Sequence, residues 1–386
     1  MADNSPDNRS ADNFPSDDFP AEDRVAQALT ELRQRIDDID GELQRLLNER
    51  ARWVLAVGEL KRENSTSGEA VFHRPEREAQ ILRSVAERNG GPFPTEDMVR
   101  LFREVISSCL ALEQPLTVAF LGPEGTFTEA AMVRHFGHAA IGRSAASIAD
   151  VFREVETGAT HYGVVPVENS TEGVINHTLD CLSRSTVRIC GEVALPIHHN
   201  LLIAPGVDVG AIRRIYSHQQ SFAQCRGWLD AHWAAVERIP VASNAEAARL
   251  AAGATDAAAV AGELARERYG LSLVAANIED ETSNTTRFHV LGRHEVGPSG
   301  RDKTSLLVAA RNEPGALYRI LEPLHRRGIN LTRIEARPAR TGNWSYVFFL
   351  DVDGHISDAL VAAAVEDVRA MAMELRILGS YPRGDV

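Results

Sequence analysis

Positively charged side chains near the N-terminus have a spacing that could hold an anion. Between residues 25 and 60, apolar residues recur every four and three positions, the repeat of a helix that packs against other helices. Arg50 occupies one position of this apolar seam, and a guanidinium among apolar side chains is costly unless an anion meets it. Arg33 and Lys61 are four heptads apart and lie along one edge of the seam. The spacing therefore predicts an anion-binding helix face.

The length of this helix indicates how such a site could be completed. At about 1.5 Å per residue, Arg33 lies about 25 Å from Arg50 along the axis, and Lys61 lies about 16 Å from it. A metabolite-sized anion can bridge the shorter gap but not the longer one. Arg33 can therefore take part only from an antiparallel partner helix, which predicts an intertwined homodimer with mixed sites.

The residues of the helical segment, 23–114, resemble the all-helical chorismate mutase family. The resemblance is carried by LR at 32–33, ER at 49–50, Lys61 and RE at 77–78. In that family arginines hold the two carboxylates of chorismate, a lysine contacts the ether oxygen and a glutamate binds the ring hydroxyl. The resemblance implies these roles for Arg33, Arg50, Lys61, Arg77 and Glu78. Such a pericyclic rearrangement depends on orientation and charge complementarity, without a nucleophile.

The third helix of this segment departs from the best-known family pattern. Cys109 and Glu113 stand where a serine and a glutamine are commoner, and they are i and i+4 neighbours. A glutamate facing the ether oxygen helps only when protonated, so we expect mutase activity to favour mild acid. The alternatives are an apolar-core Cys109 with a solvated Glu113, a structural ion pair at Arg50, and surface charges at Arg33 and Arg77.

Polar clusters punctuate the central segment, residues 115–296, where short β-rich runs alternate with Ala-rich helical stretches. They lie at residues 122–128, 168–173, 217–220 with 224–225, and 284–288. Each follows a predicted strand, and the carboxyl ends of strands are where an open α/β sheet binds ligands. Thr128 is expected to cap the helix that follows the first cluster. No catalytic triad, metal-ligand set or dinucleotide fingerprint occurs, so we expect no cofactor and no metal.

This combination, above all the NTTRF run, resembles the prephenate dehydratase family, whose fold is two α/β lobes around a cleft, similar to periplasmic binding proteins. The resemblance implies a catalytic hydroxyl on Thr286, a carboxylate anchor at Arg287 and packing by Phe288. It implies polar cleft contacts from Asn169, Glu168 and Gln224. His218 could assist by titration or be structural, Thr286 could merely cap, and Cys225 is expected to be a packed thiol rather than a nucleophile.

The C-terminal segment, residues 303–386, follows a strand, helix, strand, strand, helix, strand order typical of the α+β ferredoxin-like arrangement. The runs NEPGAL at 312–317 and EARP at 335–338 resemble the amino-acid-binding ACT domain. The resemblance implies a phenylalanine site at a domain dimer interface, formed by Asn312, Gly315, Ala316, Leu317, Glu335 and Arg337. Ala336 stands where the family more often has serine. The alternative is a dimerisation module that binds no effector.

The composition of the chain excludes several classes of partner and site. The net charge of −13 argues against nucleic acid or anionic membranes as partners, and the four cysteines show no metal or disulfide spacing. The acidic stretch 1–22 is predicted to be a disordered tail, and 297–302 a linker. No apolar run is long enough for a bilayer span, so we expect a cytoplasmic protein.

Together the three segments predict a multidomain chain: an all-α intertwined mutase domain, a two-lobed α/β dehydratase domain and an ACT domain. They imply consecutive steps of phenylalanine biosynthesis, chorismate to prephenate and prephenate to phenylpyruvate, with feedback by phenylalanine. A homodimer is expected, and a higher oligomer is compatible. The alternatives are a non-enzymatic amino-acid sensor, and a dehydratase whose mutase has decayed.

Overall fold

The computed structural model describes residues 21–64, 73–310, 313–338 and 346–384. The chain divides into two compact units, Met1–Asn64 and Ser65–Val386. Most of the predicted acidic tail, and Asn312 of the predicted effector site, lie outside the described residues. The first helix begins at Ala21, two residues inside the stretch predicted as the tail.

Helix α1 (Ala21–Glu63) is a single helix of 43 residues. The apolar side chains of the predicted seam are 46–69% exposed; they are Val25, Leu29, Leu32, Ile36, Ile39, Leu43, Leu46, Trp53, Val57 and Leu60. Arg45 pairs with Glu42 and Glu49 one turn to either side, on the polar face. An apolar stripe of this length without cover is typical of a helix that packs against another subunit.

The second unit opens with α2 (Pro75–Arg88) and α3 (Thr95–Glu113). Proline suits the first turn of α2 because its missing N–H would have no helical partner there. The two helices pack through Leu82, Val85, Val99 and Ile106. The predicted helical segment 23–114 therefore spans both compact units.

One α/β lobe is built on a mixed sheet with the strand order β2-β1-β3-β11-β5, and β4 pairs with β3. Its strands are β1 (Thr117–Leu121), β2 (Ile141–Ala145), β3 (Tyr162–Asn169), β4 (Gly173–Val174), β5 (Arg188–Pro196) and β11 (Thr285–Gly292). Its helices are α4 (Phe127–Phe136), α5 (Ile148–Glu156) and α6 (Asn176–Leu182). The near-continuous apolar run of β3 is buried, as expected for a central strand covered on both faces.

A second lobe is inserted between β5 and β11, with the strand order β10-β6-β9-β7-β8. Its strands are β6 (Asn200–Ile203), β7 (Arg214–His218), β8 (Glu237–Val241), β9 (Ala257–Ala261) and β10 (Ser272–Ala275). Its helices are the 3₁₀ turn η1 (Val209–Ala211), α7 (Gln219–Gln224), α8 (Arg226–His232), α9 (Asn244–Ala252) and α10 (Glu263–Arg268). The chain thus passes between the lobes twice, after β5 and before β11.

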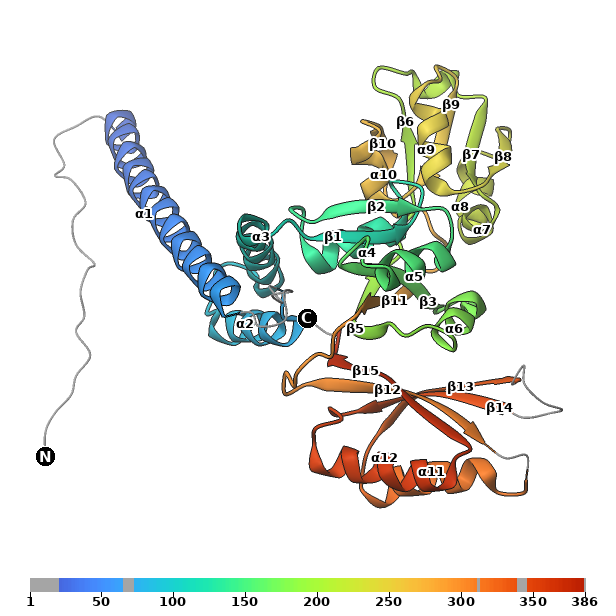
Figure 1. Cartoon of the computed structure of the whole chain (residues 1–386). Helices are drawn as coiled ribbons and strands as arrows, with labels where there is room; N and C mark the ends of the chain where they lie inside the picture. Colours follow the sequence, from blue (N-terminus) through green and yellow to red (C-terminus); the bar gives the residue numbers. More distant parts are fainter. Residues whose placement is uncertain (1–20, 65–72, 311–312, 339–345, 385–386) are drawn as a thin grey trace, which may run out of the picture. The chain divides into compact units, whose positions relative to one another are not determined.

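The C-terminal domain has the order β12 (Asp302–Ala310), α11 (Ala316–Arg326), β13 (Leu331–Pro338), β14 (Tyr346–Asp353), α12 (Ala359–Met371) and β15 (Glu374–Pro382). This is the order expected from the sequence, and the sheet runs β13-β14-β12-β15. Helices α11 and α12 cover one face of the sheet (Figure 1), through a core that includes Leu306, Ile320 and Val365. On the other face, Leu307 and Phe349 join the core of the first lobe, so these two parts share buried apolar surface.

Among the residues that the structure describes, no helix combines the length and apolar character needed to cross a membrane. In the same residues no group of three or more His, Cys, Asp or Glu side chains is placed to hold a metal ion.

Candidate active site

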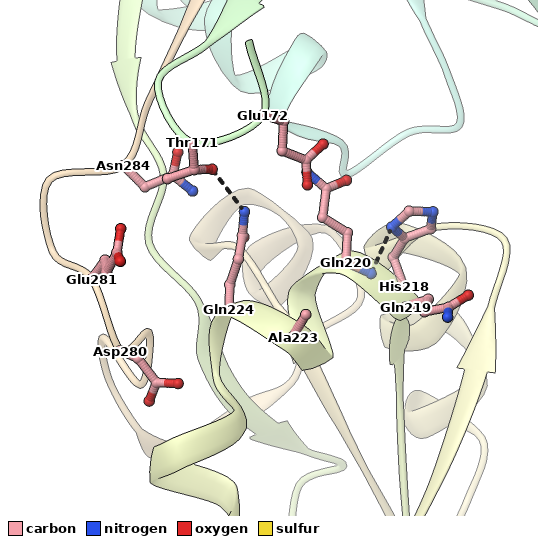
Figure 2. Close-up of a pocket in the computed structure, with 10 residues that line it drawn as sticks. All are labelled: Thr171, Glu172, His218, Gln219, Gln220, Ala223, Gln224, Asp280, Glu281 and Asn284. Atoms are coloured by element: carbon pink, nitrogen blue, oxygen red, sulfur yellow. Dashed lines mark hydrogen bonds between the residues drawn. The ribbon is translucent and has the colours of Figure 1, made fainter.

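A cleft of about 520 Å³ lies between the two α/β lobes, within the range of small-molecule sites. Its polar lining comes from both lobes and comprises Thr126, Thr128, Asn169, Glu172, His199, His218, Gln220, Ser221, Gln224, Ser243, Asn244, Asn284 and Thr286. An adjoining hollow of about 670 Å³, drawn in Figure 2, shares Glu172, His218, Gln220, Gln224 and Asn284 with it. The polar clusters predicted at strand ends therefore do meet in one place.

Thr286 is held in this cleft by Asn169 on the neighbouring strand. The two residues are opposite each other in the antiparallel pairing of β11 with β3. The Asn169 side-chain amide donates to Thr286 Oγ1 and to Asn284 Oδ1, each at 2.8 Å. Asn169 Oδ1 in turn accepts from the backbone N–H groups of Thr171 and Glu172. Because the Thr286 oxygen accepts from Asn169, its own hydroxyl proton is available for a ligand.

Gln224 and His218 are both placed at the cleft by α7. Gln224 donates to Thr171 Oγ1 at 3.4 Å and so links the lobes, as Figure 2 shows. Its Oε1 lies 2.8 Å from His199 Nε2, and burial lowers the pKa of that histidine. His218 caps α7, with Nδ1 accepting from the Gln220 N–H. This cap is a structural role for one ring nitrogen, and the ring still lines the cleft.

The described lining of the cleft contains no arginine or lysine. Instead, one helix from each lobe begins there: α4, capped by Thr126, and α9, capped by Ser243. Helix N-termini present unpaired N–H groups that favour anions. The predicted cap at Thr128 is wrong, since that residue already lies inside α4 and the cap is Thr126.

Arg287 and Glu168 lie outside the cleft lining, contrary to the prediction of substrate contacts for both. Successive side chains of a strand point to opposite faces, so Arg287 faces away from Thr286, and Glu168 away from Asn169. Arg287 NH1 lies 3.3 Å from Glu168 Oε2. The carboxylate anchor expected at Arg287 is therefore placed behind the cleft, paired with an acid.

Several lining residues were not singled out by the sequence. Asn244 and Ser221 are joined by a 2.8 Å hydrogen bond on the wall formed by the second lobe. Behind the opposite wall, Glu129 of α4 does not line the cleft itself. It accepts from the Gly125 N–H and pairs at 2.6 Å with Arg268 of α10, which ties the lobes together. The Ser243-Asn244 pair, a cap directly after a strand, was the available signal for this wall.

The predicted mutase residues are divided between the two compact units. Arg33, Arg50 and Lys61 lie on α1, where Arg33 is exposed and the other two are partly exposed. In the second unit, Arg77 is exposed on α2, and Cys109 is buried on α3 with Glu113 one turn further on.

Glu78 of α2 has a partner that was not predicted. Its carboxylate lies 3.0 Å from His73 Nε2 in a largely buried position. Burial alone would raise the pKa of Glu78, but the hydrogen bond and charge of His73 leave it below the usual value.

The predicted effector residues that the structure describes lie at the start of α11 and on β13, an edge strand of the C-terminal sheet. Gly315 has a φ of 77° and caps α11, whose first residues are Ala316 and Leu317. Glu335 and Arg337 lie on β13, alternating with exposed neighbours. Arg337 is engaged with the dehydratase-like lobe: it donates to Asn176 at 2.6 Å and pairs with Asp180 at 3.1 Å, both on α6.

Family models match the chain in three consecutive stretches: chorismate mutase type II over residues 32–114, prephenate dehydratase over 118–296 and the ACT domain over 304–370. These matches confirm the three resemblances noted in the sequence.

Relatives match across nearly the whole length. A bifunctional chorismate mutase/prephenate dehydratase from Stutzerimonas stutzeri is 53% identical over 359 residues, covering 93% of this chain and 98% of its own. One from Pseudomonas aeruginosa is 52% identical over 356 residues, covering 92% and 98%. A solved prephenate dehydratase from Arthrobacter aurescens, in complex with L-Phe, has a TM-score of 0.64 and 36% identity over 70% of this chain and 91% of its own. The chain therefore belongs to the family of bifunctional chorismate mutase/prephenate dehydratases that carry an ACT regulatory domain.

Proposed function

We propose that this chain rearranges chorismate to prephenate on its helical segment and converts prephenate to phenylpyruvate in the interlobe cleft. Phenylalanine binds the ACT domain and inhibits the second step. The observation that carries the dehydratase assignment is the Asn169–Thr286 pair in a cleft of substrate size.

In the dehydratase step, prephenate loses its ring carboxylate as CO₂ and its ring hydroxyl as water, and aromatisation supplies the driving force. The cleft must therefore hold the two carboxylates and assist the departure of the hydroxyl group. Thr286 donates its hydroxyl proton in a hydrogen bond to the leaving oxygen, because Asn169 occupies the threonine oxygen as a donor. An ordinary threonine is a weak acid, so its role is to stabilise the departing hydroxide and relay a proton rather than to ionise.

The cleft holds the substrate carboxylates with neutral groups. The N-termini of α4 and α9 direct backbone N–H groups into it, and Asn244 and Gln220 add side-chain amides. A wall without arginine or lysine also suits decarboxylation, since a cation bound tightly to the ring carboxylate would stabilise the charge that must leave as CO₂.

Replacing Thr286 tests this assignment. Thr286→Ala is expected to lower the dehydratase kcat by about 10²-fold or more, a typical contribution of a positioned proton donor. Thr285→Ala is the matched control, because it removes the neighbouring hydroxyl on the opposite face of β11. Phenylpyruvate formation is followed spectrophotometrically. Equal rates for both variants would demote Thr286 to a structural hydroxyl.

The residues proposed for the mutase reaction are Arg33, Arg50 and Lys61 on α1, and Arg77 and Glu78 on α2. Arginines bind the two carboxylates of chorismate, Lys61 contacts the ether oxygen and Glu78 the ring hydroxyl, as the family resemblance implies. Glu113 assists at the ether oxygen when protonated. An ordinary carboxyl is ionised at neutral pH, so Glu113→Gln is expected to keep mutase activity there and to flatten its acid preference. An unchanged pH profile would remove Glu113 from the site.

An antiparallel homodimer completes this site. The apolar seam of α1 is exposed along its length, and a second copy of the same seam would cover it. Mixing an Arg33→Ala variant with an Arg50→Ala variant tests the sharing of sites, because hybrid dimers regain one intact site. Failure of any mixture to regain mutase activity would count against it.

The ACT domain is proposed to bind phenylalanine at the start of α11 and along β13. Titration calorimetry with phenylalanine, against tyrosine as the control ligand, measures this directly. Absence of binding heat and of inhibition would leave the domain as a dimerisation module only.

One assay separates the proposal from its alternatives. We also propose that the protein works in the cytoplasm. Chorismate added to the purified full chain should disappear and yield phenylpyruvate. Turnover of prephenate without turnover of chorismate would indicate a decayed mutase. Binding of phenylalanine without either reaction would indicate an amino-acid sensor.

A further inference from the structure

The strand pair that holds Thr286 has a second face, directed away from the cleft. In the register of β11 with β3, Thr286 is opposite Asn169 and Arg287 is opposite Glu168. The pair Thr286–Asn169 lines the cleft, and the pair Arg287–Glu168 lies behind it. Glu168 directly precedes Asn169, and Asn169 orients the Thr286 hydroxyl. A displacement of Glu168 would therefore also displace Asn169.

The regulatory domain reaches this rear face with a charged side chain. Arg333, on β13, has its Nε 3.3 Å from Glu168 Oε2, the same oxygen that faces Arg287 NH1 at 3.3 Å. The Arg333 side chain is only 7% exposed. A guanidinium buried to this degree must be paired with an anion, since an unpaired buried charge is strongly destabilising. Glu168 is thus a carboxylate shared by a cation of the catalytic strand and a cation of the regulatory sheet.

The surroundings of Arg333 restrict any independent movement. Asp351, its register neighbour on β14, accepts from Ser305 Oγ at 2.6 Å. Beside them Lys303 of β12 forms a buried pair with Glu192 of β5, at 2.6 Å. At Gly379 of β15, an added Cβ would lie 2.1 Å from the Ile189 carbonyl oxygen, so the two backbones are in direct contact. The regulatory sheet is therefore attached to the catalytic lobe through both charge pairs and close packing.

We propose that Arg333 is a positioning residue for the dehydratase reaction, which places the Thr286 hydroxyl through Glu168 and Asn169. It rests on the proposed dehydratase function of the cleft. The regulatory domain then contributes to the rate of the chemical step even when no effector is bound. A rearrangement of β13 that moves Arg333 would lower turnover without touching the substrate.

The test compares two arginines of the regulatory sheet in the full chain. Arg333→Gln removes the charge behind the catalytic strands. Arg376→Gln is the matched control: Arg376, on β15, also crosses to the lobe, but it donates to the Ser183 and Ser185 carbonyls, away from β3 and β11. Both variants are assayed with prephenate in the absence of phenylalanine.

The expected result is a split between kcat and KM. Arg333→Gln should lower kcat by about tenfold or more, since sub-ångström misplacement of a reacting group is that costly, with KM within about twofold. Arg376→Gln should leave both within about twofold, and chorismate turnover should be unchanged in both. Arg333→Lys, which restores the cation, should recover most of the lost kcat.

A double-mutant cycle closes the test. Glu168→Gln alone should lower kcat as Arg333→Gln does, and the double variant should be no worse than either, because both act through one contact. Equal kcat for Arg333→Gln and Arg376→Gln, or additive effects of the two charge removals, would overturn the inference. If Arg333→Gln fails to fold by circular dichroism, Glu168→Gln and Arg333→Lys decide in the same way. A wild-type chain without prephenate turnover would instead overturn the proposed function.

Discussion

The two proposed sites of this chain hold a small dicarboxylic acid in opposite ways. The groups proposed to bind the carboxylates in the mutase are cations on helices, and those of α1 lie along an exposed apolar seam. The dehydratase cleft has no arginine or lysine in its described lining and relies on amides, hydroxyls and the starts of two helices. A rearrangement that keeps both carboxylates can hold them with full charges. A reaction that expels one of them as CO₂ is better served by weaker, neutral donors.

The contrast extends to what each site needs from its surroundings. The proposed mutase site includes a second copy of the exposed seam of α1, whereas the cleft is enclosed by two lobes of one chain and contacted from behind by the regulatory sheet. Charge removal should therefore damage the first site directly. In the second it should act only through position.

The largest effect is expected at Arg50. Arg50→Ala should lower mutase kcat/KM by about 10³-fold, the loss typical of a transition-state charge donor, and leave prephenate turnover unchanged. Chorismate loss is followed by ultraviolet absorbance. Arg45→Ala, on the polar face of the same helix and paired with Glu42, is the control and should be nearly silent. If Arg50→Ala lowered the mutase kcat/KM only a few-fold, Arg50 would not be a charge that binds the transition state directly.

Arg287 should behave differently, although it directly follows Thr286. Because it lies behind the cleft, Arg287→Gln is expected to lower dehydratase kcat by about tenfold through position, with KM for prephenate within about twofold. Steady-state kinetics with prephenate measure both constants. A large rise in KM at constant kcat would instead make Arg287 a substrate anchor, as its place in the NTTRF run first indicated.

His289 tests how strongly the rear face depends on pH. It is 2% exposed on β11, and burial, aided by Arg333 and Arg287, holds its pKa well below the usual value. Below about pH 6.5 the unfolded chain binds a proton at this histidine that the folded chain does not bind. The free energy of unfolding therefore decreases by about 1.4 kcal/mol for each unit by which the pH is lowered.

The neutral variant His289→Phe should remove this part of the slope. Urea unfolding at neutral and at mildly acidic pH measures it, with the exposed His138→Phe as the control. Identical slopes for the parent and for His289→Phe would show that the imidazole does become charged in the folded state.

The smallest effect is expected from salt. Raising ionic strength from about 0.05 M to about 0.5 M should raise KM for chorismate by roughly threefold, because salt screens exposed cations. The KM for prephenate should change less, since the described lining of the cleft has no arginine or lysine to be screened. Equal salt dependence of the two constants would contradict substrate binding without cations.

Much of this arrangement could be predicted from local patterns. The heptad seam predicted α1, Pro75 predicted the start of α2, and the polar clusters at strand ends predicted where a ligand would bind. Each of these depends on spacing within a few residues. The family resemblance then implied the cleft, the places of Thr286, Asn169 and Gln224 in it, and the chemistry.

The errors have physical causes. The family resemblance assigned Arg287 and Glu168 to the cleft, whereas the alternation of side chains along a strand sends them to the other face. Their partner Arg333 could not be predicted, since it is distant in the sequence and only sheet packing brings it to Glu168. Thr126, two residues before the expected cap, gained that role because the turn ends earlier.

The burial of three of the four thiols has a practical consequence. Cys109, Cys190 and Cys225 are buried, and burial raises the pKa of Cys190 to about 12, so these sulfurs resist alkylation. Cys181 is partly exposed on α6, next to Asp180, which pairs with Arg337. A maleimide dye would therefore label the unaltered protein at one place, and its fluorescence would report directly whether β13 departs from the lobe when an inhibitor arrives.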